Sequence, residues 1–97
     1  MLAEEVKIRF SGFEPTYDVR STVYHLLDQM HLRVPSKSLL TATFTLTNGV
    51  FEGVIKVTSV AEQFVVNARD TQLSALGSKL AEKLGAQLDN WRKLRFE

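Results

Sequence analysis

The sequence predicts an α+β two-layer sandwich, in which a four-stranded sheet carries two helices packed on one face. Three observations lead to this fold class. The chain has 97 residues, so residues 1–97 are expected to form a single domain. Alternating and helix-spaced apolar patterns follow one another in the order β-α-β-β-β-α. The apolar faces can meet in one core, while a threonine-rich sheet face is left open.

The first two elements are a strand and a helix. Residues 6–11 alternate between apolar and polar side chains, which is the period of a half-buried strand. Apolar residues then recur every three or four positions, and this predicts an amphipathic helix over residues 17–31. Thr16 is the expected N-cap, because its hydroxyl can accept a bond from a backbone N–H of the first turn. The helix is expected to end before Pro35, because the residue before a proline avoids helical geometry.

A β-hairpin is the clearest local prediction. Residues 40–47 alternate strictly, and Asn48-Gly49 supplies the two positive φ angles of a type I′ turn. A two-residue turn at this point pairs positions whose numbers sum to 97. Every pair on the core face is then apolar or glycine: Leu46–Phe51, Phe44–Gly53, Ala42–Ile55 and Leu40–Val57.

The chain closes with a fourth strand and a long helix. Residues 63–68 alternate again and can continue the antiparallel meander, after a loose loop because Val60-Ala61 is poor turn chemistry. Leucines at helical spacing predict a helix over about residues 71–93, with Asp70 or Thr71 as its cap. The strand–helix–strand connection places the first strand parallel to the second, so both helices cover the same face.

Composition excludes several classes of protein. The chain is 44% hydrophobic and 24% charged, as in ordinary folded domains, and it has no cysteine, so disulfides, thiolate metal sites and cysteine nucleophiles are impossible. Its net charge is only +1, so any nucleic-acid partner has to be inferred from local patches. The sequence shows no signal peptide and no apolar run of the ~18–20 residues needed for a membrane span. We therefore expect a cytoplasmic protein without a membrane partner.

No catalytic pattern is present in the sequence. His25 and His31 lie six positions apart, about 120° around a helix, so they cannot share a metal without a third element. A glycine-rich phosphate loop, an HExxH pattern and a GxSxG pattern are all missing. We expect no enzyme activity, no cofactor, no metal and no small-molecule substrate.

Basic side chains are the remaining candidates for function. They fall on two surfaces: Lys7, Arg9 and Lys56 on the open sheet face, and Lys79, Lys83, Arg92 and Lys93 on the last helix. At 100° per residue the three helix lysines lie within an arc of about 80° beside the apolar stripe. Glu82 and Asp89 lie one turn away from these cations, so an ordinary solvated helix face also explains the pattern.

Several segments together carry a family resemblance. The βαβββα order, the strand Val6-Lys7-Ile8-Arg9-Phe10, the Glu14-Pro15-Thr16 start of the first helix, the Asn48-Gly49 turn and the run from Lys83 to Leu88 cover nearly the whole chain. The sharpest match is Lys-Leu-x-x-Gln-Leu in the last helix. With these features the chain resembles the ribosome hibernation promoting factor family, also called the sigma-54 modulation or S30AE ribosomal-protein family, in a short or divergent form.

The resemblance implies a function. It implies a non-enzymatic, cytoplasmic stress-response factor that binds the 30S ribosomal subunit through 16S rRNA phosphates and inhibits translation. Carried over by position, the phosphate contacts would be Lys7, Arg9, Lys79, Lys83, Arg92 and Lys93, with Arg20 as a further candidate. Lys56 joins this RNA-binding set through its place on the sheet face.

An alternative function belongs to another class. The near-neutral charge is also compatible with a protein-interaction domain that has this fold but has lost ribosome binding. Three valines, Val50, Val54 and Val65, are expected on the open sheet face, where they could contact a partner or form a weak homodimer.

Overall fold

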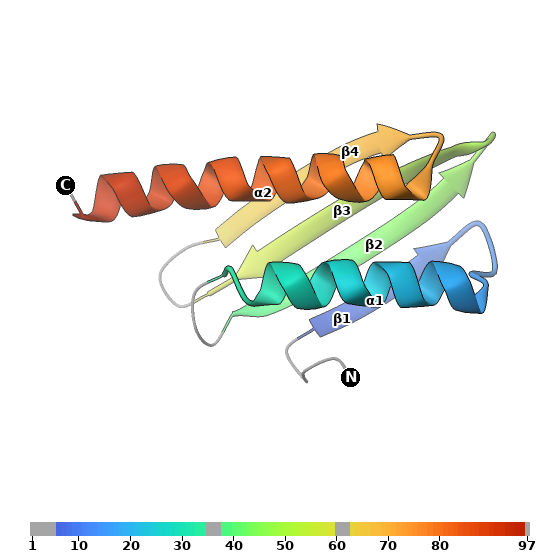
Figure 1. Cartoon of the computed structure of the whole chain (residues 1–97), viewed down its shortest axis with the longest axis horizontal. Coiled ribbons are helices and arrows are strands. Elements are labelled where there is room, and N and C mark those ends of the chain that lie inside the picture. Colours follow the sequence, from blue (N-terminus) through green and yellow to red (C-terminus); the bar gives the residue numbers. More distant parts are fainter. Residues whose placement is uncertain (1–5, 35–37, 60–62, 97) are drawn as a thin grey trace.

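The elements of the computed structural model follow the predicted order (Figure 1). The structure describes residues 6–34, 38–59 and 63–96. Pro35 and the loop at residues 60–61 lie outside the described residues. The elements are β1 (Val6–Ser11), α1 (Tyr17–His31), β2 (Leu39–Thr47), β3 (Val50–Thr58), β4 (Gln63–Asp70) and α2 (Leu73–Phe96).

The sheet has the predicted topology and register. Its strand order is β1-β2-β3-β4, with β1 parallel to β2 and the other two pairings antiparallel. The hairpin pairs Leu46 with Phe51 and Leu40 with Val57, as the turn chemistry requires. Asn48 and Gly49 have φ angles of 51° and 78°, so both accept the left-handed geometry of a type I′ turn.

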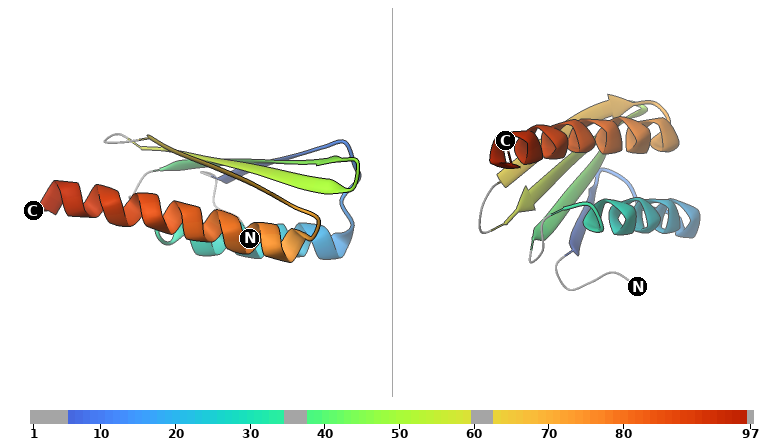
Figure 2. Two further views of the ribbon diagram at one scale, coloured as in Figure 1. Left: turned by 90° about the horizontal axis from the view of Figure 1, so that it is seen from above. Right: turned by 60° about the vertical axis from the view of Figure 1, so that its left-hand side comes forward.

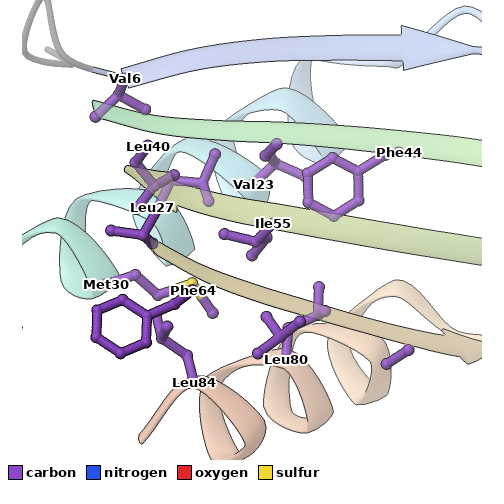
Figure 3. Close-up of a cluster of buried hydrophobic side chains, with 14 of the residues drawn as sticks. Val6, Val23, Leu27, Met30, Leu40, Phe44, Ile55, Phe64, Leu80 and Leu84 are labelled. Carbon is purple, nitrogen blue, oxygen red and sulfur yellow. The ribbon is translucent and has the colours of Figure 1, made fainter. Parts of the chain in front are cut away.

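Both helices lie on one face of the sheet, and the other face is open (Figure 2). The core between the layers receives buried apolar side chains from all six elements (Figure 3). Phe44, Ile55, Leu27, Leu80 and Leu84 are among those with no exposed surface. Removing this apolar surface from water is the main force that holds the two layers together.

Two glycines set how closely the layers approach. A Cβ on Gly53 of β3 would lie 2.8 Å from Cδ1 of Leu80, so the missing side chain lets α2 settle onto the sheet. A Cβ on Gly77 would lie 3.2 Å from Cδ2 of Leu26, so this glycine lets α1 and α2 pack closely. At both positions the absence of a side chain lets the neighbouring elements pack more closely.

The start of α1 agrees with prediction, whereas the start of α2 does not. The N–H of Val19 donates to the Thr16 hydroxyl at 3.2 Å, so Thr16 is the N-cap of α1. Helix α2 begins at Leu73, two residues later than expected. The predicted cap was wrong because the Asp70 carboxylate accepts instead from the N–H of Gln72, which precedes the helix, at 3.0 Å.

Candidate nucleic-acid interface

Three of the predicted cations gather at one end of the open sheet face. The strand register places Lys7 next to Thr41 and Thr41 next to Lys56, so a hydroxyl lies between two ammonium groups. Arg9 lies next to Thr43 in the adjoining row, and Lys7, Arg9, Thr41 and Thr43 line a shallow depression. We call Lys7, Arg9, Thr41, Thr43 and Lys56 the sheet-face patch. Its three cations are exposed.

The positive charge of this patch is not neutralised on the sheet. Among the described residues, the ion pairs are Arg69 with Glu52 and Lys79 with Asp70, and neither uses a patch cation. Glu52 lies four residues along β3 from Lys56, about 13 Å away. This exceeds the screening length of about 10 Å in 0.1 M salt, and Arg69 Nε already lies 2.9 Å from the Glu52 carboxylate. The patch therefore stays available to an anion.

Two of the three predicted lysines of α2, Lys79 and Lys83, bind the neighbouring strand β4. Lys79 Nζ donates to the carbonyl of Arg69 at 3.0 Å and pairs with Asp70 Oδ2 at 2.9 Å. Lys83 Nζ donates to the carbonyl of Asn67 at 2.6 Å. Both ammonium groups thus bind β4. Sequence reasoning placed them on the correct helix but did not detect this role.

The pKa of Asp70 reflects its contact with Lys79. The Lys79 ammonium, through its hydrogen bond, holds the pKa of Asp70 below its ordinary value of 3.8, and the Gln72 N–H acts in the same direction. The Asp70 carboxyl is therefore ionised at neutral pH. Much of the Lys79 charge is already compensated by its neighbour.

The other predicted cations are scattered. The Arg20 guanidinium lies 5.8 Å from the centre of the Phe10 ring, on the helix side of the sheet. Arg92 donates to the carbonyl of Arg33 at 2.9 Å, which ties α2 to the end of α1. Lys93 is exposed near the C-terminal end of α2. The structure thus brings Lys7, Arg9 and Lys56 together and separates them from the helix cations.

A metal centre or a membrane span would each leave a recognisable feature in the molecule. Within the described ranges, no three His, Asp or Glu side chains gather as metal ligands. None of the helices in those ranges, α2 included, has a long enough apolar stretch to cross a membrane.

The comparisons with known proteins define the fold class first. No family model matches the sequence, and no curated protein matches it. Solved structures do match, and the two described below share the fold of this chain over most of its length. The fold that the sequence resemblance implied is thereby confirmed.

Two structures illustrate this similarity. The N-terminal domain of Thermus thermophilus Protein Y superposes with a TM-score of 0.74 at 19% identity, over 89% of this chain and 96% of that one. A ribosomal subunit interface protein from Coxiella burnetii gives a TM-score of 0.70 at 14% identity, over 90% of this chain and 98% of that one. Each match spans almost an entire domain on both sides.

Proposed function

We propose that this domain binds the small ribosomal subunit in the cytoplasm through 16S rRNA phosphates and inhibits translation as a hibernation factor under stress. The single observation that carries the proposal is the sheet-face patch, where three cations flank two threonine hydroxyls and no described residue is an acidic partner. Similarity in fold to a ribosomal subunit interface protein supports the ribosome as the partner.

The chemistry of the patch suits a nucleic-acid backbone. Lysine and arginine neutralise phosphates and release bound counterions, and hydroxyls add hydrogen bonds to phosphate oxygens. Such contacts position a protein on RNA without reading sequence and without chemical change. The proposed activity is therefore binding that blocks translation, with no catalytic step and no cofactor.

The predicted cations should contribute unequally. Lys7, Arg9 and Lys56 are the proposed primary contacts, because reaching a phosphate breaks no ion pair within residues 6–34, 38–59 and 63–96. Arg20 and Arg92 are secondary candidates, since a guanidinium with five donors can keep one contact and make another. Lys93 is a further secondary candidate, because it is exposed near the end of α2 and lies apart from the patch. Lys79 and Lys83 would have to release carbonyls of β4 first, so we expect them to contribute least.

Co-sedimentation with purified 30S subunits at about 50 and 200 mM salt tests the proposal. The patch variant is Lys7→Gln with Lys56→Gln, and the matched control is Lys79→Gln with Lys83→Gln, which removes the same two charges elsewhere. Losing two phosphate contacts should lower the salt slope by about 1.4–1.8, so the loss of affinity between the two salts becomes about tenfold smaller. The control should keep the wild-type slope. Wild type should also inhibit translation in a reconstituted reaction.

The outcomes separate the candidate functions. Failure of the wild type to sediment with 30S at low salt would refute ribosome binding. That result would favour the protein-interaction alternative, in which Val50, Val54 and Val65 on the open face mediate a partner contact or a weak homodimer. An equal decrease of the salt slope in both double variants would show that the phosphate contacts are assigned to the wrong residues.

A further inference from the structure

Three side chains of α2 donate hydrogen bonds to the outer edge of β4. The acceptors are backbone carbonyls of alternate residues, and the donors are one helical turn apart. The bonds join Lys79 to Arg69 at 3.0 Å, Lys83 to Asn67 at 2.6 Å and Gln87 to Val65 at 2.9 Å. We call these three bonds the edge ladder.

The ladder forms because two repeats match. Four residues of helix rise about 6.0 Å, and two residues of strand advance about 6.6–6.8 Å. Helix numbers increase as strand numbers decrease along the ladder, so α2 runs antiparallel to β4. Long side chains absorb the small difference, so each helical turn supplies one donor for each outward carbonyl.

Without the ladder, the β4 edge would be able to pair with a strand of another chain. Strand β4 is the last strand of the sheet, and its outward carbonyls and N–H groups would form a template for a further strand. In an antiparallel strand the N–H and C=O of one residue point to the same side, so the amides of Val65, Asn67 and Arg69 share this edge. Val65 is 47% exposed, which leaves apolar surface beside it.

The sequence of β4 is compatible with pairing to a second copy of itself. An antiparallel pair centred on Asn67 would set Val65 opposite Arg69 of the second copy and Val66 opposite Ala68 of the second copy. No like charges would meet across this pair.

The β1 edge is protected in another way. A self-pair of β1 centred on Ile8 would set Lys7 opposite Arg9 of the second copy, and like charges directly opposite destabilise a pair of strands. In this register the charges of β1 oppose self-pairing, whereas the charges of β4 do not oppose it in the register centred on Asn67.

We propose that the edge ladder prevents dimerisation through the β4 edge, by closing β4 against β4 of a second copy. When the donors are lost, two four-stranded sheets join through antiparallel β4 strands into one continuous sheet. The inference involves no ribosome and is independent of the proposed function.

Single and triple methionine variants test the ladder. Lys83→Met removes the central donor while keeping a long side chain, and the triple variant adds Lys79→Met and Gln87→Met. Lys83→Gln is the first control, because it removes the charge and keeps a donor of the kind that Gln87 already uses. Lys93→Met is the second, because it makes the same substitution on the same helix away from β4.

The expected effect is a monomer-to-dimer shift in sedimentation equilibrium. One hydrogen bond changes an equilibrium constant about fivefold. Dimerisation of the wild type would break the Lys83 bond in each of the two copies, whereas the Lys83→Met variant has no such bond to break. Lys83→Met should therefore raise the association constant about 25-fold. The triple variant should dimerise more strongly. Both controls should behave like the wild type.

Hydrogen exchange locates the contact. The amides of Val65, Asn67 and Arg69 should gain protection in the Lys83→Met dimer and in no control. Folded variants that stay monomeric would overturn the proposal, as would a dimer without protection at these three amides. If the triple variant fails to fold, the single variant decides by the same criteria.

Discussion

Gly53→Ala tests how the two layers fit, because this glycine of β3 faces Leu80 of α2. A Cβ at this position would lie 2.8 Å from Cδ1 of Leu80 and 3.2 Å from Cε1 of Phe44, closer than ordinary contact. Overpacking of a core typically costs about 1–3 kcal/mol. Alanine also favours a strand over glycine by about 0.5–1 kcal/mol. The net loss of unfolding free energy should therefore be about 1–2 kcal/mol.

A double-mutant cycle isolates the clash. Leu80 is fully buried, so Leu80→Ala should cost about 3–5 kcal/mol. In that background the methyl group of Gly53→Ala enters vacated space, and the substitution should become neutral or stabilising by about 0.5 kcal/mol. The coupling free energy should be about 2 kcal/mol, measured by urea denaturation of the four proteins.

The control for backbone strain is Gly49→Ala. Gly49 has a φ of 78°, and a Cβ at this position would have nothing within 4 Å, so its cost of about 1 kcal/mol is conformational. That cost should not change when Leu80 is replaced. Additive effects of Gly53→Ala and Leu80→Ala would refute the argument that Gly53 is present to admit the Leu80 side chain.

Two smaller predictions concern a helix end and an ion pair. Thr16→Ala should cost about 1 kcal/mol through loss of the N-cap, while Thr16→Ser should keep most of the stability in the same denaturation assay. An unchanged midpoint for Thr16→Ala would contradict the cap. The Asp70 carboxyl should titrate below 3.8 by NMR, and Lys79→Met should raise its pKa. Because folding lowers the pKa of Asp70, the stability that the pair contributes is fully present above pH 3.8 and is lost as the pH falls through the pKa of the folded protein. An Asp70 titration at the ordinary value would exclude the pair.

Local chemistry explains why so much of the fold was predictable. Asn48-Gly49 fixes both the turn type and the pairing of β2 with β3, and the alternation of residues 40–47 agrees with the same register. Each of these signals lies within a few residues of the structure that it predicts. The order of the sheet then follows from the handedness and shortness of the connections.

The roles of the helix lysines were not predictable in the same way. A helical projection places Lys79 and Lys83 beside the apolar stripe, but it does not say which strand edge lies next to them. Their acceptors, Arg69 O and Asn67 O, are ten and sixteen residues away in sequence. A signal was present in the spacing of Lys79, Lys83 and Gln87, which matches alternate residues of an edge strand.

The edge ladder also limits how large such a domain can grow. Each step from one rung to the next loses about 0.7 Å of alignment between a straight helix and a strand, because their repeats are about 6.0 and 6.7 Å. Three rungs accumulate about 1.4 Å, which flexible lysine and glutamine side chains can span. A ladder with twice as many rungs would drift by about 3.5 Å, about half of the strand repeat, and would outrun the donors of a single helix. The length of outer strand that one helix can cover in this way is thus limited by the helical rise per residue rather than by the size of the core.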